Sequence, residues 1–253
     1  MHWTDDAHTS FGPPRTRTDQ RKVTKRMAPR FIARQLAFPK GIAGTVMGLL
    51  MNIHNARINE FAIAKMSVRS PEKILEIGFG GGLALARLIA LSQHLSGVDR
   101  SADMVRQANS KFRKAVDDGR ADFRVANAEA LPFDSATFGN VLTINTIYFW
   151  KSLEACCIEI RRVLAPGGQA IIGFMPKEHM AKKKMPADIF SLRTIDDVTT
   201  ALRNAGFAET RIERPEASPE WALVLAKNQE DGASMTKPPA DSAAMPSTPM
   251  TGV

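Results

Sequence analysis

The feature that most constrains the fold is a short apolar run that ends in a cluster of glycines. Lys73–Ile77 has the length and composition of a buried strand, and the glycines of residues 78–82 follow it at once. Glycine adopts positive φ angles and lets a ligand approach the backbone closely. Residues 83–91 then show helical apolar spacing. A strand, a glycine-rich turn and a helix in this order predict a nucleotide-binding turn.

The alternation of strand and helix continues along the chain. We predict further strands at residues 95–99, 121–125, 141–144, 169–174, 207–213 and 221–226, and helices at residues 102–116, 153–164 and 194–204. Thr194 is the expected N-cap of the last helix, and Pro166-Gly167-Gly168 is expected to cap the helix before it. This alternation predicts a mainly parallel sheet with helices on both faces, whose ligands bind beyond the carboxyl ends of the strands.

Composition divides the chain into four segments. We expect a disordered basic arm at residues 1–28, a helical cover at 29–70, an α/β domain at 71–227 and a disordered tail at 228–253. Residues 1–40 carry nine Lys/Arg and three Asp, so they supply most of the net charge of +8. Such an arm could bind nucleic acid or an acidic membrane surface, although a solvated lead-in segment is the simpler interpretation.

Several sequence features bear on the location and on metals. No stretch reaches the roughly 20 apolar residues of a membrane-spanning helix. The polar, acidic start of the chain is unlike a secretory signal or a transit peptide. Cys156 and Cys157 are adjacent and match no metal spacing. We therefore expect a cytoplasmic protein without a metal site.

Three features outside the glycines indicate which ligand the turn binds. Asp99 ends the second predicted strand, where a carboxylate can accept the hydroxyls of a ribose. Glu76 directly precedes the turn, where it would repel a pyrophosphate and suits a ligand with an amino group. Residues 127–133 follow the third strand, where an adenine edge would meet the chain. Asp99 fits a dinucleotide equally well, whereas Glu76 and residues 127–133 favour S-adenosylmethionine over a dinucleotide.

The sequence resembles the class I methyltransferases, in the subgroup of the ubiquinone and menaquinone methyltransferases, over roughly residues 71–227. Four motifs in order carry the resemblance: Ile74-Leu75-Glu76-Ile77-Gly78-Phe79-Gly80-Gly81-Gly82, Gly97-Val98-Asp99, Ala128-Glu129-Ala130-Leu131-Pro132-Phe133 and Arg161-Arg162-Val163-Leu164-Ala165-Pro166-Gly167-Gly168. The resemblance implies a three-layer, Rossmann-like α/β fold with a seven-stranded, mainly parallel sheet whose last strand is antiparallel, and an N-terminal helical cover. It also implies S-adenosylmethionine as the cofactor.

The resemblance further implies residue roles. Gly78 and Gly80 would line the methionine moiety, and Asp99 would hold the ribose. Met104 and Asn127-Ala128 would lie near the adenine. The full set of expected cofactor-binding residues is Glu76, Gly78, Phe79, Gly80, Gly82, Asp99, Arg100, Met104, Asn127, Ala128, Glu129 and Asn145. The chain departs from the family at Asn127, where Asp is common, and at Phe138-Gly139, where Phe-Asp is common.

The methyl acceptor is expected at residues 145–150, an aromatic cluster that follows the fourth strand and contains the only tyrosine. The expected substrate residues are Asn145, Tyr148, Phe149 and Trp150, with core packing beneath the next helix as the alternative. Tyr148 and His179 are the candidate catalytic residues. The alternative for His179 is that it is merely solvated, as a lone histidine in a polar loop usually is.

We expect in-line methyl transfer to a small, apolar or aromatic molecule, for which alignment matters more than a strong acid or base. The alternative is an RNA or protein methyltransferase that uses the basic arm. The chain has no recognisable RNA-binding module, so we expect no nucleic-acid partner. Intact Gly78, Gly80 and Asp99 speak against a non-catalytic binder that has kept the fold. The sequence leaves the oligomeric state open.

The helical cover has two interpretations. It could form an adaptable apolar lid over the ligands, to which Phe31, Leu36, Met47, Met51 and Ile53 would contribute. Alternatively, this basic and apolar stretch could rest on a membrane surface, which would suit a lipid or quinone substrate.

Overall fold

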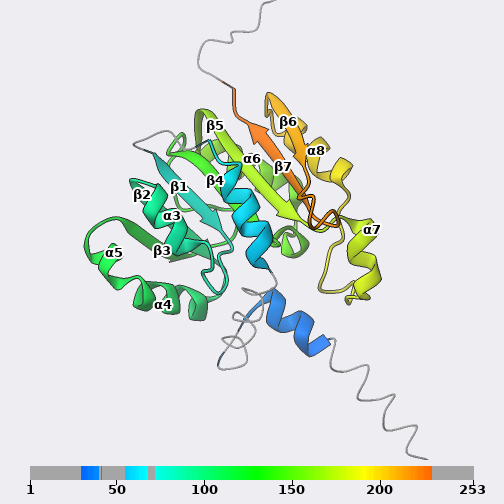
Figure 1. The fold of residues 1–253 in the computed structure, drawn as a ribbon, viewed down its shortest axis with the longest axis horizontal. Helices are drawn as coiled ribbons and strands as arrows, with labels where there is room; N and C mark the ends of the chain where they lie inside the picture. Colours follow the sequence, from blue (N-terminus) through cyan, green and yellow to red (C-terminus); the bar gives the residue numbers. More distant parts are fainter. Residues whose placement is uncertain (1–29, 40, 42–54, 68–71, 230–253) are drawn as a thin grey trace, which may run out of the picture.

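The computed structural model describes residues 30–39, 41, 55–67 and 72–229 (Figure 1). The predicted basic arm, the lid residues Met47, Met51 and Ile53, and nearly all of the predicted tail lie outside the described residues. The fold itself includes the first residues of that predicted tail. The Asn228 backbone N–H donates to the Gly168 carbonyl at 2.8 Å, and its side chain donates to the carbonyls of Leu164 and Ala165.

The strands and helices alternate through most of the described chain. The strands are β1 (Lys73–Ile77), β2 (His94–Asp99), β3 (Ala121–Val125), β4 (Phe138–Ile144), β5 (Leu164–Phe174), β6 (Glu209–Glu213) and β7 (Ala222–Lys227). The helices are α3 (Leu85–Leu91), α4 (Ala102–Lys111), α5 (Arg113–Asp117), α6 (Leu153–Val163), α7 (Lys177–Met180) and α8 (Ile195–Asn204), with 3-10 turns η1 (Ile147–Phe149) and η2 (Ala181–Lys183). Residues 30–37 and 55–64 are also helical.

The seven strands form one sheet in the order β3-β2-β1-β4-β5-β7-β6. β1 to β5 pair in parallel, whereas β7 runs antiparallel to both β5 and β6. In Figure 1 the arrowhead of β7 accordingly points away from that of β5. The predicted sheet with an antiparallel last strand is therefore confirmed.

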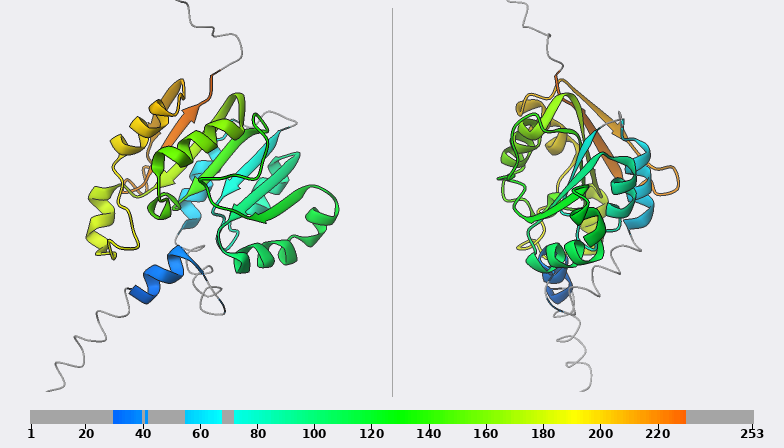
Figure 2. Two further views of the ribbon diagram at one scale, coloured as in Figure 1. Left: turned by 180° about the vertical axis from the view of Figure 1, so that it is seen from behind. Right: turned by 90° about the vertical axis from the view of Figure 1, so that its left-hand side faces the viewer.

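Helices cover both faces of the sheet, so the fold has three layers (Figure 2). On one face, Ile160 of α6 and Val198 of α8 belong to the core cluster that contains Leu75 of β1. On the other face, Leu88 of α3 and Met104 of α4 pack in a second cluster, which also takes in side chains from residues 55–64. Burial of these apolar side chains is the main force that holds the layers together.

Two predicted boundaries are wrong for local physical reasons. The single helix predicted at residues 102–116 is interrupted at Phe112, whose φ and ψ of −107° and 25° are not helical and whose ring packs against Phe123. β5 begins at Leu164, although Pro166-Gly167-Gly168 were expected to cap the helix and precede the strand. Phe138 pairs with Leu164 but Asn140 pairs with Gln169, so residues 165–168 bulge from the sheet.

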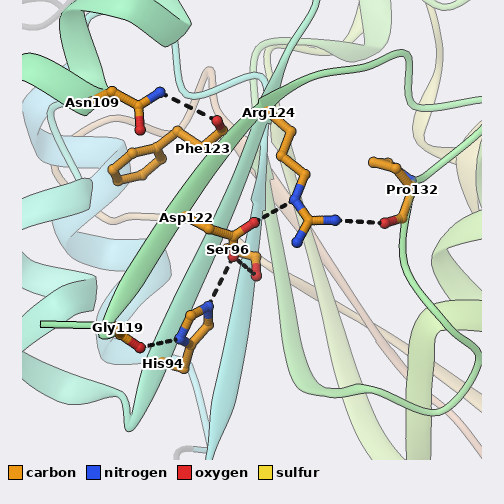
Figure 3. A network of polar contacts seen from close by, with 8 residues as sticks. All are labelled: His94, Ser96, Asn109, Gly119, Asp122, Phe123, Arg124 and Pro132. Carbon is orange, nitrogen blue, oxygen red and sulfur yellow. Dashed lines mark hydrogen bonds and ion pairs between the residues drawn. The ribbon is translucent and has the colours of Figure 1, made fainter. Parts of the chain in front are cut away.

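A polar network at the outer strands holds the loop after β3 (Figure 3). Arg124 donates through Nε to Asp122 at 2.6 Å and through a terminal nitrogen to the Pro132 carbonyl at 3.0 Å. Asp122 also accepts from Ser96 and contacts His94, and these hydrogen bonds keep the pKa of Asp122 below its usual value although partial burial opposes them.

The opposite side of this loop is held by α6. Arg162 donates to the carbonyls of Leu131 and Phe133 at 3.0 and 2.7 Å, and it forms an ion pair with Glu159. Glu159 in turn accepts from the Leu131 backbone N–H at 2.8 Å. The loop is thus fixed from two elements, which positions residues 127–129 at the carboxyl end of the sheet.

Candidate functional site

A cavity of about 420 Å³ lies at the carboxyl ends of the central strands, and its volume suits a small molecule. It is lined by the turn after β1, the end of β2, the loop after β3, the segment after β4 and residues 36–39. These segments are far apart in sequence. They meet because parallel strands bring their carboxyl ends to one edge of the sheet.

The structure brings together most of the residues predicted for the site. The predicted residues that line the cavity are Gly78, Gly80, Asp99, Arg100, Asn127, Ala128, Glu129, Asn145, Phe149 and Trp150. The remaining predicted residues are not among the lining residues: Glu76, Phe79, Gly82, Met104, Tyr148 and His179.

The turn after β1 requires glycine. Gly78, Gly80 and Gly82 have φ angles of 72°, 51° and 67°, which residues with a side chain rarely adopt. At Gly78 a Cβ atom would also lie 2.2 Å from Cγ2 of Thr146. The backbone can therefore approach the segment after β4 only at a glycine, and the turn stays open toward the cavity.

Asp99 is fixed at the end of β2 by two backbone donors. One carboxylate oxygen accepts from the Gly80 N–H at 2.9 Å, and the other accepts from the Ser101 N–H at 2.8 Å. Burial raises the pKa of Asp99, and these two hydrogen bonds oppose that rise. Each carboxylate oxygen retains a second lone pair, so the group can still accept hydrogen bonds from a diol.

Glu76 is an unsatisfied buried carboxyl beside this site. Glu76 is 5% exposed, and its Oε2 atom has no hydrogen-bond partner in the described part of the chain. Burial, reinforced by the charge of Asp99, raises the pKa of Glu76 to about 8. An unpaired buried acceptor is costly, and an ammonium group would satisfy it. The site thus fits the amino-acid end of S-adenosylmethionine.

The loop after β3 is anchored to the start of α6 through Glu129. Glu129 accepts from the backbone N–H groups of Lys151 and Ser152 at 2.8 and 3.0 Å, at the start of α6. A carboxylate is favoured there by the positive end of the helix dipole. This anchoring role was not predicted, because the sequence does not show that α6 begins beside residue 129.

Asn145 occupies the end of β4 with a left-handed backbone, at φ 61°. Its side-chain nitrogen donates to the Asn55 side-chain oxygen at 3.0 Å, and its backbone N–H donates to the Gly173 carbonyl at 2.8 Å. Asn145 therefore lines the cavity and also ties the helical residues 55–64 to the sheet. A strained residue held by several partners is common at functional sites.

Tyr148 has a different position from the one expected. It is 2% exposed and does not line the cavity. Its hydroxyl accepts from the Met175 N–H at 2.7 Å and donates to the Met175 carbonyl at 3.1 Å. Burial raises the pKa of Tyr148 further above its usual value. These contacts give the hydroxyl a positioning role, whereas its neighbours Phe149 and Trp150 face the cavity.

His179 lies on α7, not in the loop that was predicted, because Pro176 and the carbonyls after β5 begin a short helix there. It is partly exposed and does not line the cavity.

Within residues 30–39, 41, 55–67 and 72–229, no group of three or more His, Cys, Asp or Glu side chains is arranged to hold a metal ion. In the same ranges, no helix is long and apolar enough to cross a membrane.

Residues 36–39 cover one side of the cavity and are held by the start of α4. The Ser101 hydroxyl donates to the Pro39 carbonyl at 2.7 Å, and the Arg100 guanidinium lies 5.2 Å from the centre of the Phe38 ring. Ser101 is also the N-cap of α4, a role its place before a helical pattern could have indicated. Its contact with Pro39 spans 62 residues, so no sequence signal revealed it.

Comparison with known proteins also indicates a methyltransferase. A family model described as a methyltransferase domain matches residues 75–172. The uncharacterized methyltransferase YdaC of Bacillus subtilis (strain 168) is 25% identical over 181 residues, which cover 70% of this chain and 94% of that protein. The O-methyltransferase cnsE of Penicillium expansum is 28% identical over 150 residues, 56% of this chain and 54% of that protein. The chain thus spans only about half the length of cnsE.

A solved structure shows the same fold. Geranyl diphosphate C-methyltransferase from Streptomyces coelicolor A3(2), in complex with Mg²⁺, geranyl diphosphate and S-adenosyl-L-homocysteine, superposes with a TM-score of 0.59. The sequence identity is 15%, and the match covers 69% of this chain and 77% of that chain. The matched domain and the methyltransferases named above support S-adenosylmethionine-dependent methyl transfer by this chain.

Proposed function

We propose that the cavity binds S-adenosylmethionine through the turn after β1, the end of β2 and the loop after β3. In this arrangement Gly78 and Gly80 contact the methionine moiety, Glu76 accepts from its ammonium group, and Asp99 accepts from the ribose hydroxyls. Asn127-Ala128 meets the adenine edge. The bound cofactor supplies an activated methyl group, and these residues bind and orient it.

The other predicted cofactor residues act less directly. Phe79 packs edge-on against Phe123, and Met104 is a buried residue of α4, so both support the backbone that lines the site. Gly82 provides the positive φ at the end of the turn. Arg100 and Glu129 line the cavity, but each also holds a neighbouring segment in place.

The acceptor is a small, apolar or aromatic molecule bound between residues 36–39 and the segment after β4. Leu36, Phe38, Phe149 and Trp150 give this part of the cavity apolar walls. Asn145 is the polar group that orients the acceptor, and Tyr148 supports Asn145 through a 3.4 Å contact. The resemblance to quinone methyltransferases supports such an acceptor, and the name of the O-methyltransferase cnsE supports transfer to an oxygen atom. We assign no catalytic role to His179, because it lies outside the cavity lining.

The observation that carries this proposal is the convergence of Gly78, Gly80, Asp99 and residues 127–129 on one cavity, beside the unpaired carboxylate oxygen of Glu76. The test is a transfer assay with methyl-labelled cofactor against phenols, hydroquinones, thiols, amines and tRNA. We expect label on a phenol or hydroquinone. Trp150→Ala is expected to raise the KM for that acceptor without changing the Kd for the cofactor. Transfer to tRNA alone would contradict the proposed acceptor class.

A further inference from the structure

Two adjacent apolar side chains face solvent on the helical residues 30–37. Phe31 is 56% exposed and Ile32 is 41% exposed, whereas the next residue, Ala33, is fully buried in the core. Exposure of one large apolar residue is ordinary, but a neighbouring pair on a short amphipathic helix indicates a surface that contacts something apolar. The pair is therefore a candidate interaction site.

This helix also forms part of the cavity. Leu36 and Ala37, one turn beyond the exposed pair, line it. A partner bound at Phe31 and Ile32 would consequently contact the same helix that covers part of the cavity. The location distinguishes this pair from exposed apolar residues elsewhere, such as Ile158 on α6.

Cationic side chains lie on the same helix and on the segment that this helix contacts. Arg30 forms an ion pair with Asp188 at 2.5 Å, which links the helix to the segment that follows η2. Figures 1 and 2 show α7 and this helix at the same end of the molecule. The exposed basic residues of these two segments are Arg34, Lys177, Lys182, Lys183 and Lys184, whereas their acidic residues are Glu178 and the paired Asp188.

We propose that this surface, made of Phe31, Ile32, Arg34, Lys177 and Lys182–Lys184, binds an anionic lipid bilayer. Apolar side chains that enter the acyl boundary and basic side chains that meet anionic headgroups are the two contributions that hold a peripheral protein on a membrane. Phe31 has an aromatic face that can stack on a base, but Ile32 does not, whereas both side chains can enter an acyl boundary; this favours lipid over RNA.

The surface binds lipid whether or not the proposed acceptor is right. The delivery of an apolar acceptor from the bilayer to the cavity, by contrast, rests on the proposed function. The pair lies on the helix whose residues Leu36 and Ala37 line the cavity, so a bound bilayer would lie close to the acceptor part of the site.

The experiment is vesicle co-sedimentation of the full chain, with phosphatidylcholine alone and with equal parts of phosphatidylcholine and phosphatidylglycerol. We expect binding to the anionic vesicles only, and a loss of at least about tenfold in partitioning for the double variant Phe31→Ser/Ile32→Ser. Ile158→Ser, at an equally exposed helical position, is the matched control and should bind as the wild type does. The melting temperature and the cofactor Kd of the double variant check that the fold and the site are intact.

The basic residues are tested in the same way. Lys182→Gln/Lys183→Gln/Lys184→Gln should lower anionic-vesicle binding about tenfold or more, because each charge near such a surface contributes on the order of 1 kcal/mol. The triple variant Lys111→Gln/Arg113→Gln/Lys114→Gln changes the net charge equally on α4 and α5 and should lower binding much less.

Several outcomes would overturn the proposal. These are no binding to anionic vesicles, wild-type binding by the Phe31/Ile32 double variant, or equal losses in the two triple variants. Binding of tRNA that depends on Phe31 and Lys182–Lys184, without vesicle binding, would assign the surface to RNA instead. Calorimetry with S-adenosylmethionine is a separate readout, so failure of the cofactor site and failure of the lipid surface are distinguishable.

Discussion

The hydroxyl of Tyr148 satisfies both backbone groups of Met175, accepting from its N–H at 2.7 Å and donating to its carbonyl at 3.1 Å. This pair joins η1 to the chain just after β5. Because Asn145, which is 3.4 Å from the same hydroxyl, lines the cavity, the pair also fixes the floor of the proposed acceptor site.

Tyr148→Phe should therefore lower stability more than it lowers cofactor affinity. The substitution leaves a buried N–H and a buried carbonyl without a partner, which costs about 1–3 kcal/mol. Chemical denaturation measures this loss, and calorimetry should show an almost unchanged Kd for S-adenosylmethionine. A stable variant with complete loss of methyl transfer would instead return Tyr148 to a catalytic role.

Glu76→Gln should stabilise the free protein at pH 8 and weaken cofactor binding. The pKa of Glu76 rises from 4.5 to about 8 on folding, so the folded state holds this proton more tightly between those values. The free energy of unfolding of the wild type must then fall as pH rises through this range, by up to about 1.4 kcal/mol per pH unit from this group.

Denaturation of the free protein at pH 5.5, 6.5, 7.5 and 8.5, values chosen to span roughly that window, measures this slope for the wild type, Glu76→Gln and the exposed control Glu216→Gln. We expect a smaller slope only in Glu76→Gln, together with a cofactor Kd at least about tenfold higher at pH 8. An unchanged slope would show that Glu76 is ionised in the free protein.

Gly78→Ala and Gly80→Ala should differ in cost although both glycines have positive φ. A Cβ at Gly80 meets open space, so only backbone strain of about 1 kcal/mol is expected. At Gly78 a Cβ lies 2.2 Å from Cγ2 of Thr146, which adds a clash. Thr146→Ser removes that methyl group and should recover part of the stability of Gly78→Ala but none of that of Gly80→Ala, as measured by a double-mutant cycle.

Ser101→Ala should loosen residues 36–39. The variant loses the 2.7 Å hydrogen bond to the Pro39 carbonyl and the N-cap of α4, with a cost of about 1 kcal/mol. Hydrogen exchange should become faster at residues 36–38 and at the first turn of α4, while Ser110→Ala, at an exposed position of the same helix, leaves both unchanged. Equal exchange in the two variants would show that Pro39 is held by other contacts.

The sequence was sufficient to predict features that depend on local pattern. The alternation of strands and helices predicts the sheet, and Gly78, Gly80 and Asp99, which were predicted to lie together, all line the cavity. These residues are close in the chain or lie at the ends of predictable strands. Their positions follow from the topology of a parallel sheet.

Contacts between distant segments could not be predicted. The partners of Tyr148 and Ser101 are backbone groups, which carry no sequence signal, and Glu129 binds a helix end whose position depends on packing. Gly139 is a further case. In the structure the Glu72 carboxylate occupies the place that a Cβ at residue 139 would need, so a side chain at this position would require Glu72 to move.

The central claim is that Asp99 at the end of β2 holds the ribose of S-adenosylmethionine. Titration calorimetry with S-adenosylmethionine measures it most directly, on the wild type, Asp99→Asn and the matched surface variant Asp117→Asn, whose carboxylate is exposed on α5. We predict binding by the wild type and by Asp117→Asn, and a Kd at least about tenfold higher for Asp99→Asn. A wild-type Kd in a folded Asp99→Asn variant would contradict the claim.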